Sequence, residues 1–358
     1  MIFDAVSSAA AGSVFGAALL ASGVHHPAII QEQFRLNNFR MLHTFTIAMG
    51  SGAIAMLALK LRGSPSPRQH VRSNTPLGTR LGQYDGNLIG GAILGVGMAL
   101  TGACPGTMIV QLADSGTYWS FGSVQLTLLG ALTGAVLHAL FSRQLKRSCD
   151  RDVYSDPASA PKPSPSKPTL SDVTGMSEAA VYVAFGTAIA AILRYTPVIA
   201  DGNAMTTPIV GGLIIGLAQV SSLLLTGGLV GVSTSYEQAA RYVLNAFGIS
   251  GIEKPRWPPR AIVFSAGIFA GALGLSKSGL RTETAASLIN RDLLSTAALP
   301  SWQAFLGGLA VVFGARTAGG CTSGHGLSGL ASLSFSSFLT VAAIFGAGIG
   351  TTLLMDRI

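Results

Sequence analysis

Charged residues are scarce in this chain of 358 residues: they make up 11% of it, against about a quarter in soluble domains. Hydrophobic residues make up 49%, and the mean hydropathy is +0.51. This composition excludes an ordinary soluble protein and predicts an all-α polytopic membrane protein. The net charge of +8 does not indicate nucleic-acid binding, because the basic residues stand in connections between apolar runs, where they set membrane topology.

Cysteine is also rare. Cys104, Cys149 and Cys321 are spaced too widely for a disulfide framework or a Cys-x-x-Cys metal site. The six histidines form no His-Glu-x-x-His pattern. We therefore expect no metal and no cofactor. The first residues, 1–6, lack the basic region of a cleavable signal peptide, so the first apolar run is expected to stay in the protein.

Apolar runs long enough to cross a bilayer core of about 30 Å are abundant. We predict about nine transmembrane spans, at residues 6–24, 42–60, 87–104, 120–141, 178–195, 208–226, 260–277, 302–319 and 335–355. With nine spans, the three basic connections at 60–80, 143–167 and 254–260 fall on one side. The Lys and Arg bias predicts that this side is cytoplasmic, with the N-terminus on it and the C-terminus opposite, in a cell membrane.

Glycine is plentiful, with 45 residues, and it clusters where apolar runs are interrupted. The stretch Gly-Gly-Cys321-Thr-Ser-Gly-His325-Gly-Leu-Ser-Gly cannot continue an ordinary helix, since each glycine costs about 1 kcal/mol relative to alanine. A similar break, Gly-Ala-Cys104-Pro-Gly, lies 217 residues earlier, which predicts an internal repeat. With that offset, Gly90, Gly91, Gly97, Gly102 and Cys104 fall on Gly307, Gly308, Gly314, Gly319 and Cys321.

The spans of the two halves run in opposite directions, which predicts an inverted 4+1+4 repeat. Gly12-x-x-x-Gly16 and Gly212-x-x-x-Gly216, 200 residues apart, support this pairing. Further breaks are expected at 22–27 and 225–231, followed by short half-helices at 31–38 and 236–246. We predict a first membrane repeat at residues 1–148, a disordered cytoplasmic linker rich in Ser and Pro at 149–177, a connector helix at 178–200, and a second, inverted membrane repeat at 201–358.

The breaks define a candidate substrate site, because inverted repeats bind substrate at their interface near the midplane. Half-helix N-termini offer N–H groups and partial positive charge to an anion, and a thiol offers a soft, polarizable donor. Together they indicate a sulfur-containing anion, and we expect no acidic residue in the spans near these breaks. Arg316 is either functional or reaches the membrane interface. His325 either donates to the anion or binds a freed carbonyl group, and Cys104 and Cys321 are otherwise small buried hydrophobes.

These two cysteine motifs resemble the YeeE/YedE family of sulphur-transport membrane proteins, whose studied member takes up thiosulfate. The resemblance covers nearly the whole chain. It implies an hourglass-like bundle of nine membrane helices with short helices meeting mid-membrane, and cysteines that pass the ion along by S–H···S contacts. Cys104 and Cys321 match two of three family cysteines. At the third position the chain reads Ser22-Gly-Val-His25-His26-Pro, so Ser22 or His25 replaces the thiol, or the ion differs.

We therefore predict a transporter of thiosulfate or a related sulfur anion. The alternative is an integral-membrane sulfurtransferase, an enzyme that forms a cysteine persulfide on an activated thiolate. His25 is expected at the extracytoplasmic mouth, where protonation below about pH 6.5 would favour uptake, unless it is an interfacial residue without a role. Expected partners are the anion, the lipid bilayer and a soluble sulfur-accepting protein in the cytoplasm, but not nucleic acid. The predicted substrate-binding residues are Cys104, Cys321, Gly102, Pro105, Gly106, Thr107, Gly320, Thr322, Ser323, Gly324, His325, Ser22, His25 and Arg316.

Overall fold

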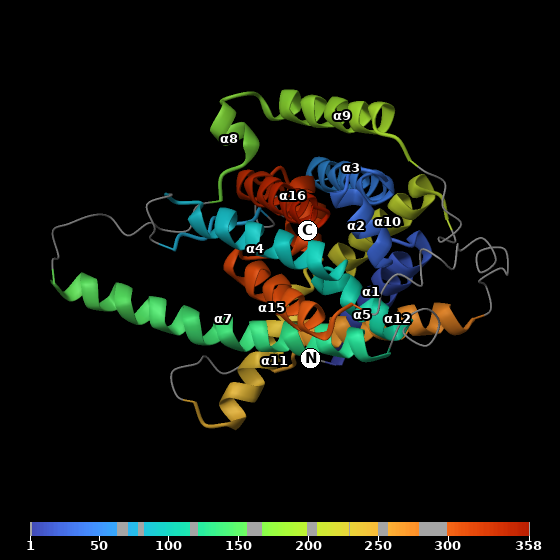
Figure 1. Ribbon diagram of the computed structural model, residues 1–358. Helices are drawn as coiled ribbons and strands as arrows, with labels where there is room; N and C mark the ends of the chain where they lie inside the picture. The colour runs from blue at the N-terminus through green and yellow to red at the C-terminus, as the bar shows by residue number, and fades with distance from the viewer. Residues whose placement is uncertain are drawn as a thin grey trace.

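The computed structural model describes residues 2–62, 71–77, 82–114, 121–155, 167–198, 206–228, 230–249, 257–278 and 299–357. Every regular element named in these ranges is a helix, which confirms the predicted all-α class (Figure 1). The elements are α1 (Ile2–Ser22), α2 (Pro27–Phe34), α3 (Arg40–Leu61), α4 (Asp85–Thr101), α5 (Pro105–Ala113), α7 (Phe121–Ser155), α8 (Leu170–Thr174), α9 (Glu178–Tyr195), α10 (Pro208–Thr226), α11 (Ser233–Ala246), α12 (Arg260–Lys277), α15 (Ser301–Thr317), the π-helix η2 (Ser323–Gly329) and α16 (Phe335–Met355).

Eight helical segments of the described chain are long and apolar enough to cross a membrane. They are Phe3–Ser22, Arg40–Leu59, Asp85–Ala113, Gly122–Ser142, Glu178–Tyr195, Pro208–Thr226, Arg260–Lys277 and Phe335–Met355. The span predicted at 302–319 is not among them. Its helix α15 has 17 residues, about 25 Å at 1.5 Å per residue, which is shorter than the bilayer core. The glycine break ends α15 early, and η2 follows it.

Helix packing has the pattern expected of an internal repeat. Helices α1 and α4 of the first half pack on α12 and α16 of the second half. Correspondingly, α10 and α15 of the second half pack on α3 and α7 of the first half. Exchanging α1 with α10, α3 with α12, α4 with α15 and α7 with α16 converts the first set of pairs into the second. The pairs α1 with α10 and α4 with α15, which also pack together, are unchanged by the exchange. This symmetry supports two equivalent halves that meet along α1, α10, α4 and α15.

The crossing of α4 and α15 shows why the sequence keeps glycine at repeating positions. A Cβ atom on Gly90 would lie 2.7 Å from the carbonyl oxygen of Gly314, and one on Gly97 would lie 2.7 Å from that of Gly307. The offset of 217 residues pairs Gly90 with Gly307 and Gly97 with Gly314. The two close approaches are therefore the same contact made once from each half. Backbones can come this close only because no side chain stands between them.

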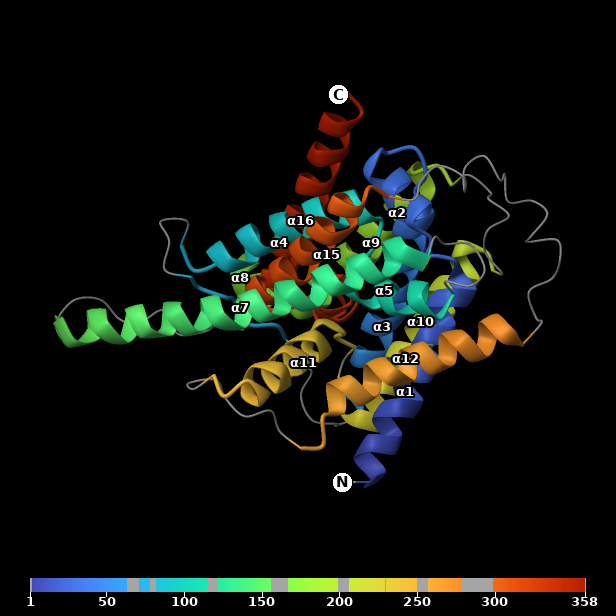
Figure 2. The ribbon, with the colours of Figure 1, turned by 60° about the horizontal axis from the view of Figure 1, so that its bottom comes forward.

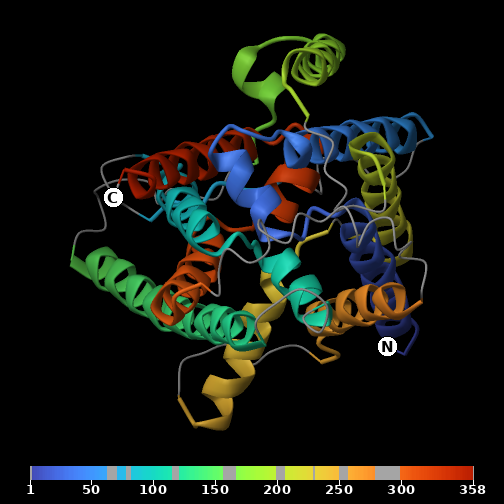
Figure 3. The same ribbon diagram turned by 45° about the vertical axis from the view of Figure 1, so that its right-hand side comes forward.

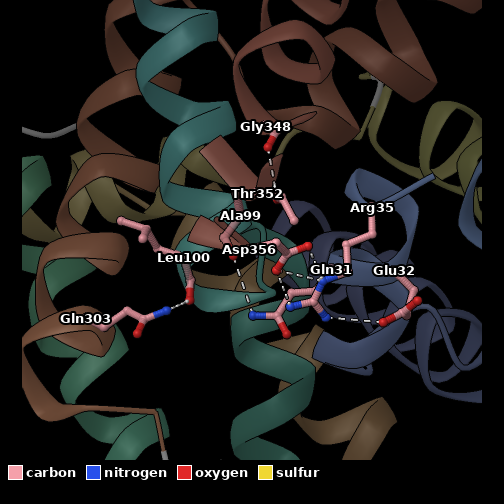
Figure 4. Close-up of polar contacts among 9 residues, drawn as sticks. All are labelled: Gln31, Glu32, Arg35, Ala99, Leu100, Gln303, Gly348, Thr352 and Asp356. Carbon is pink, nitrogen blue, oxygen red and sulfur yellow. Dashed lines mark hydrogen bonds and ion pairs between the residues drawn. The ribbon is translucent and has the colours of Figure 1, made fainter. Parts of the chain in front are cut away.

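The helix ends belong to two opposite faces. On one, the start of α1 is tied to the start of α12 by an ion pair of 2.9 Å between Asp4 and Arg260. On the other, Arg35 after α2 forms an ion pair of 3.0 Å with Asp356 after α16 (Figure 4). Figure 2 accordingly shows the N- and C-termini at opposite ends of the molecule. We call these the N-terminal face and the C-terminal face.

The segment expected to be a disordered linker is partly helical. Helix α7 continues through Ser155, since no proline or glycine interrupts residues 143–155. A capping box between Thr169 and Asp172 begins the short helix α8, and Thr169 also bridges to Ser334. Residues 156–166 lie outside the described part of the chain. The connector predicted at 178–200 corresponds to α9, which lies with α8 at the edge of the bundle (Figure 3).

Candidate functional site

Four long helices end at a glycine in the left-handed conformation. Gly23 (φ 74°), Gly102 (φ 60°), Gly227 (φ 66°) and Gly319 (φ 79°) follow α1, α4, α10 and α15. Glycine adopts this conformation without steric cost, so each position ends the helix cleanly. The short helices α2, α5, α11 and η2 come next. Compared with the sequence prediction, α2 begins at Pro27 instead of residue 31 and α11 at Ser233 instead of residue 236.

The beginnings of these short helices lie close together. A Cβ atom on Gly102 would lie 2.3 Å from Cβ of Pro27, the first residue of α2. A Cβ atom on Gly106 in α5 would lie 3.5 Å from Val232, the residue before α11. The backbone N–H of Ser233, the first residue of α11, faces Cys321 just before η2, and Ser328 near the end of η2 donates a hydrogen bond of 2.9 Å to the carbonyl oxygen of Val230. Helix N-termini carry unpaired N–H groups and partial positive charge, so their convergence favours an anion.

Cys104 stands at the N-cap of α5. Its Sγ accepts a hydrogen bond of 3.4 Å from the backbone N–H of Thr107 and another of 3.4 Å from the Thr107 hydroxyl. In return, the N–H of Cys104 donates to Thr107 Oγ1 at 2.7 Å. Pro105 suits the first helical position, where its missing N–H is not needed. The predicted residues Gly102 to Thr107 thus form one compact, buried turn.

Cys321 is fully buried at the equivalent break. Its Sγ lies 3.1 Å from the hydroxyl of Ser323, and the backbone N–H groups of Gly324 and Ser233 also face it. Ser233 is the first residue of α11, so two short helices begin at this thiol. Both Cys104 and Cys321 are free thiols, whereas the side chain of Cys149 lies outside the described structure.

Tyr236 connects the two cysteine turns, although it is not among the predicted site residues. The side chain is buried, and its hydroxyl donates a hydrogen bond of 2.9 Å to the carbonyl oxygen of Pro105. Both Cys104 and Cys321 lie close enough to interact electrostatically with this phenol. The sequence signal that could have identified Tyr236 is its position in the first turn of a short helix that follows a glycine break. Tyr236 therefore joins the candidate site from the second half.

His325 binds a freed carbonyl group, one of the two roles that the sequence left open. Its Nε2 lies 3.0 Å from the carbonyl oxygen of Ala318, and its Nδ1 lies 2.9 Å from the hydroxyl of Ser337. Asn87 donates to the same Ala318 oxygen at 3.1 Å. Both ring nitrogens are thus engaged by the protein. The imidazole is buried and stabilises the end of α15.

Other amide side chains meet the carbonyl groups that the break after α4 leaves free. Gln31 from α2 donates to Ala99 O at 3.4 Å, and Gln303 from α15 donates to Leu100 O at 2.9 Å (Figure 4). Gln111 from α5 donates to Gly102 O at 3.1 Å. Inside a membrane such carbonyl groups need partners, and here protein side chains provide them.

The two candidates at the position of the third family cysteine are both buried. Ser22 donates its hydroxyl proton to Leu19 O at 3.0 Å. His25 Nε2 lies 3.3 Å from Asp114 Oδ2, and the Ser276 hydroxyl donates to Asp114 Oδ1 at 2.7 Å. His25 is fully buried, and its place at the extracytoplasmic mouth stays a prediction. Asp114 directly follows α5, outside the spans in which no acidic residue is expected, and α12 brings Ser276 over it.

Two arginines lie beside the Cys321 turn. Arg316 forms an ion pair with Glu237 of α11 and lies 3.5 Å from the Ser233 hydroxyl, so it points into the bundle and does not reach the interface. Glu237 also binds Arg241, at 2.7 Å. The second arginine, Arg72, donates from Nη1 to Gly319 O at 3.4 Å. The sequence assigned Arg72 only to a basic connection, because nothing local marks it as buried in the bundle.

Thr322 points away from these polar groups. Its buried hydroxyl has no hydrogen-bond partner and lines an apolar cavity of about 360 Å³. The cavity lies between α2, α3, η2 and α16, with Gly326, Leu330 and Phe345 in its wall. Of the fourteen predicted site residues, Thr322 is thus the one that lines this apolar cavity. Within the described residues, no group of three His, Cys, Asp or Glu side chains could hold a metal ion.

A multi-span helical bundle with paired broken helices and buried groups at their meeting point is the architecture of a membrane transporter. The chain belongs to the sulphur transport family, whose sequence profile matches residues 21–351. Two relatives from Xylella fastidiosa are each named a probable transporter. The one from strain 9a5c is 31% identical over 150 residues, which are 41% of this chain and 93% of the relative. The one from strain Temecula1 is 30% identical over the same shares. The protein is therefore an integral, multi-pass membrane transporter.

Proposed function

We propose that the protein carries thiosulfate or a related sulfur anion through the centre of the bundle, past Cys104 and Cys321. One observation carries this proposal: two free, buried thiols, one from each half, stand at the beginnings of converging short helices with Tyr236 close to both. The membership in a sulphur transport family supports a sulfur compound as cargo.

The chemistry of the site suits a soft anion. Oxygen atoms of thiosulfate can accept hydrogen bonds from backbone N–H groups at the helix N-termini, such as those around Cys321. Its terminal sulfur is polarizable and matches a thiol, which is a weak donor. Weak contacts at successive positions favour passage, because an ion that binds too tightly cannot leave. Two thiols from opposite halves would provide two such positions.

Uptake into proteoliposomes tests this proposal directly. Purified full-length protein is reconstituted, and entry of radiolabelled thiosulfate is followed with sulfate, sulfite and selenosulfate as competitors. We expect saturable uptake that selenosulfate inhibits more strongly than sulfate, because selenium keeps the soft terminal atom. Uptake no faster than in protein-free liposomes would contradict the proposal.

Mass spectrometry of the same samples separates transport from sulfur transfer. A transporter leaves the Cys104 and Cys321 thiols unmodified after incubation with thiosulfate. A stable added sulfur atom on either thiol would instead indicate the persulfide chemistry of a sulfurtransferase.

A further inference from the structure

Arg72 lies in the described segment 71–77, between α3 and α4. Its neighbours Val71 and Asn74 are buried, with 4% and 2% of their surface exposed. The hydroxyl groups of Ser334 and Ser336 both donate to the carbonyl oxygen of Arg72, each at 3.0 Å. The backbone at this residue is therefore held against the beginning of α16, independently of its side chain.

Three glycines surround the Arg72 guanidinium group. Cβ atoms on Gly231 and Gly324 would lie 3.0 Å and 2.8 Å from Nη2, and one on Gly320 would lie 3.5 Å from Nη1. Gly320 and Gly324 flank Cys321 in sequence, and Gly231 precedes α11. The guanidinium group thus lies over the Cys321 turn, where two short helices begin. The absence of side chains at these three glycines leaves room for the guanidinium group beside the backbone.

The positive charge of Arg72 has no negative partner in the described part of the chain. Its side chain has one hydrogen bond there, the 3.4 Å contact to Gly319 O, and it forms no ion pair. The nearby Glu237 already binds both Arg316 and Arg241. Arg316 itself adds a second positive charge close enough to interact with Arg72. An uncompensated cation inside a protein is costly, and a bound anion removes that cost.

We propose that Arg72 forms an anion-binding subsite next to Cys321, which receives the oxygen atoms of a sulfur oxyanion on the N-terminal side of the thiol. This inference rests on the proposed function and names the residue that binds the cargo's charge. A guanidinium group presents planar, paired N–H donors that match two oxygen atoms of an oxyanion. Arg316, held by Glu237, contributes positive potential without being free to bind in the same way.

The described charges beside the two thiols differ. Next to the Cys104 turn, Asp114 is buried and bound by His25 and Ser276. Next to the Cys321 turn, Arg72 lies near Arg316, which shares the carboxylate of Glu237 with Arg241. The two breaks have similar backbones but opposite electrostatic surroundings. An anion that passes from Cys104 to Cys321 therefore moves toward positive potential.

Thermal unfolding of the purified full-length protein tests the subsite. We compare wild type, Arg72→Gln and Arg72→Lys, with Arg62→Gln as the matched control because Arg62 belongs to the same connection but is exposed. Sodium thiosulfate, sulfate, sulfite and chloride are added at equal ionic strength. Thiosulfate should raise the Tm of wild type and Arg62→Gln, because a ligand that binds the folded state stabilises it. Arg72→Gln should weaken the apparent affinity at least tenfold, and Arg72→Lys by less.

The unfolding curve without added oxyanion separates a binding role from a packing role. If Arg72 binds the anion, Arg72→Gln removes a half-buried charge that has no negative partner among the described residues, and its Tm without oxyanion should equal or exceed that of wild type. A lower Tm together with an unchanged thiosulfate response would overturn the subsite. Should the glutamine variant fail to fold, Arg72→Lys keeps the charge but lacks the planar paired N–H donors, so an unchanged thiosulfate response in this variant would count against the subsite.

The two proposals fail in different ways. If sulfate or sulfite stabilises wild type through Arg72 but thiosulfate neither stabilises it nor enters proteoliposomes, the subsite stands and thiosulfate is the wrong cargo. If thiosulfate enters with equal KM in wild type and Arg72→Gln, thiosulfate transport stands and the subsite is refuted. The subsite is likewise refuted if none of these oxyanions stabilises the wild type.

Discussion

At the scale of single residues, Cys104 stands where a helix would normally be capped by oxygen. Serine, threonine, aspartate and asparagine are the preferred N-cap residues, because their oxygen atoms accept strong hydrogen bonds from the first turn. Sulfur is a weaker acceptor, and its contacts with Thr107 are correspondingly long, at 3.4 Å. Capping alone therefore does not explain a thiol at this position. The proposed contact with a soft substrate would explain it.

Replacing either central cysteine by alanine should abolish thiosulfate uptake with little loss of folded protein. The side chains differ by one sulfur atom, so the packing loss should be about 1 kcal/mol. Uptake and Tm are measured for Cys104→Ala and Cys321→Ala. Cys149→Ala, which changes a cysteine outside both breaks, is the control and should transport normally. Normal uptake by both central variants would show that the thiols only fill space.

His325 should behave as a structural residue. Replacing it by alanine leaves the Ser337 hydroxyl without its hydrogen-bond partner and the Ala318 carbonyl with Asn87 alone, which we expect to cost about 2 kcal/mol. Ser337→Ala should cost less, and the double variant should cost less than the sum, because the two residues share one bond. Tm gives the stability, and uptake is normalised to folded protein. Lost uptake at wild-type stability would instead place His325 in contact with the substrate.

At the scale of elements, the broken helices depend on partners from distant parts of the chain. The end of α4 is stabilised by amides of α2, α5 and α15, and the end of α15 by Asn87 and His325. The helix crossings depend instead on the absence of side chains. Broken helices are therefore stable in the bundle because each freed group is bound and each crossing is close.

The crossing of α4 and α15 gives a direct test of this dependence. A Cβ atom on Gly97 would lie 2.6 Å from the backbone nitrogen of Val311, so Gly97→Ala must push the helices apart. We expect a loss of about 1–3 kcal/mol and a lower Tm. Gly346→Ala is the matched control, since a Cβ atom there meets nothing within 4 Å and alanine favours the helix by about 1 kcal/mol. Equal Tm values for the two variants would show that the crossing tolerates a side chain.

At the scale of the whole molecule, two equivalent halves each contribute residues to one candidate site. The exchange symmetry of the helix pairs is matched by the probable transporter of strain 9a5c, which aligns over 93% of its length with 41% of this chain. A relative of that size corresponds to about one half of this chain, which supports the half as the structural unit. Each half contributes one thiol, and the charges around the two thiols differ.

The topology of the chain can be tested at its two ends, because α1 begins on the N-terminal face and α16 ends on the C-terminal face. We predict that the N-terminus and the connection around 143–167 face the cytoplasm and that Ile358 faces the other side. Tags at each terminus, probed in intact and permeabilised cells for accessibility to a membrane-impermeant label, measure this. The result should be label at the C-terminal tag in intact cells and at both tags after permeabilisation. Equal accessibility of the two tags in intact cells would contradict the inverted arrangement.

The sequence by itself determined the class, the transmembrane segments and the position of the cysteine breaks. Hydropathy, glycine content and the spacing between similar motifs are properties of short stretches, and they act on the local backbone wherever it lies. Gly102 and Gly319 illustrate this, because each ends its helix in the conformation that glycine favours. The difference between the span predicted at 302–319 and helix α15 also has a local cause, because the glycine break at Gly319 limits α15 to 17 residues.

Only the tertiary structure decided which side chains surround the breaks. His25 meets Asp114 across 89 residues of sequence, and Arg72 meets Gly319 across 247. No pattern of short range encodes such pairs, because they arise when helices from both halves pack together. Hydrophobic burial specifies that segments pack, but the partner of a polar group depends on the exact register and crossing of the helices. The breaks were therefore readable in the sequence, whereas the charges that distinguish one break from the other were not.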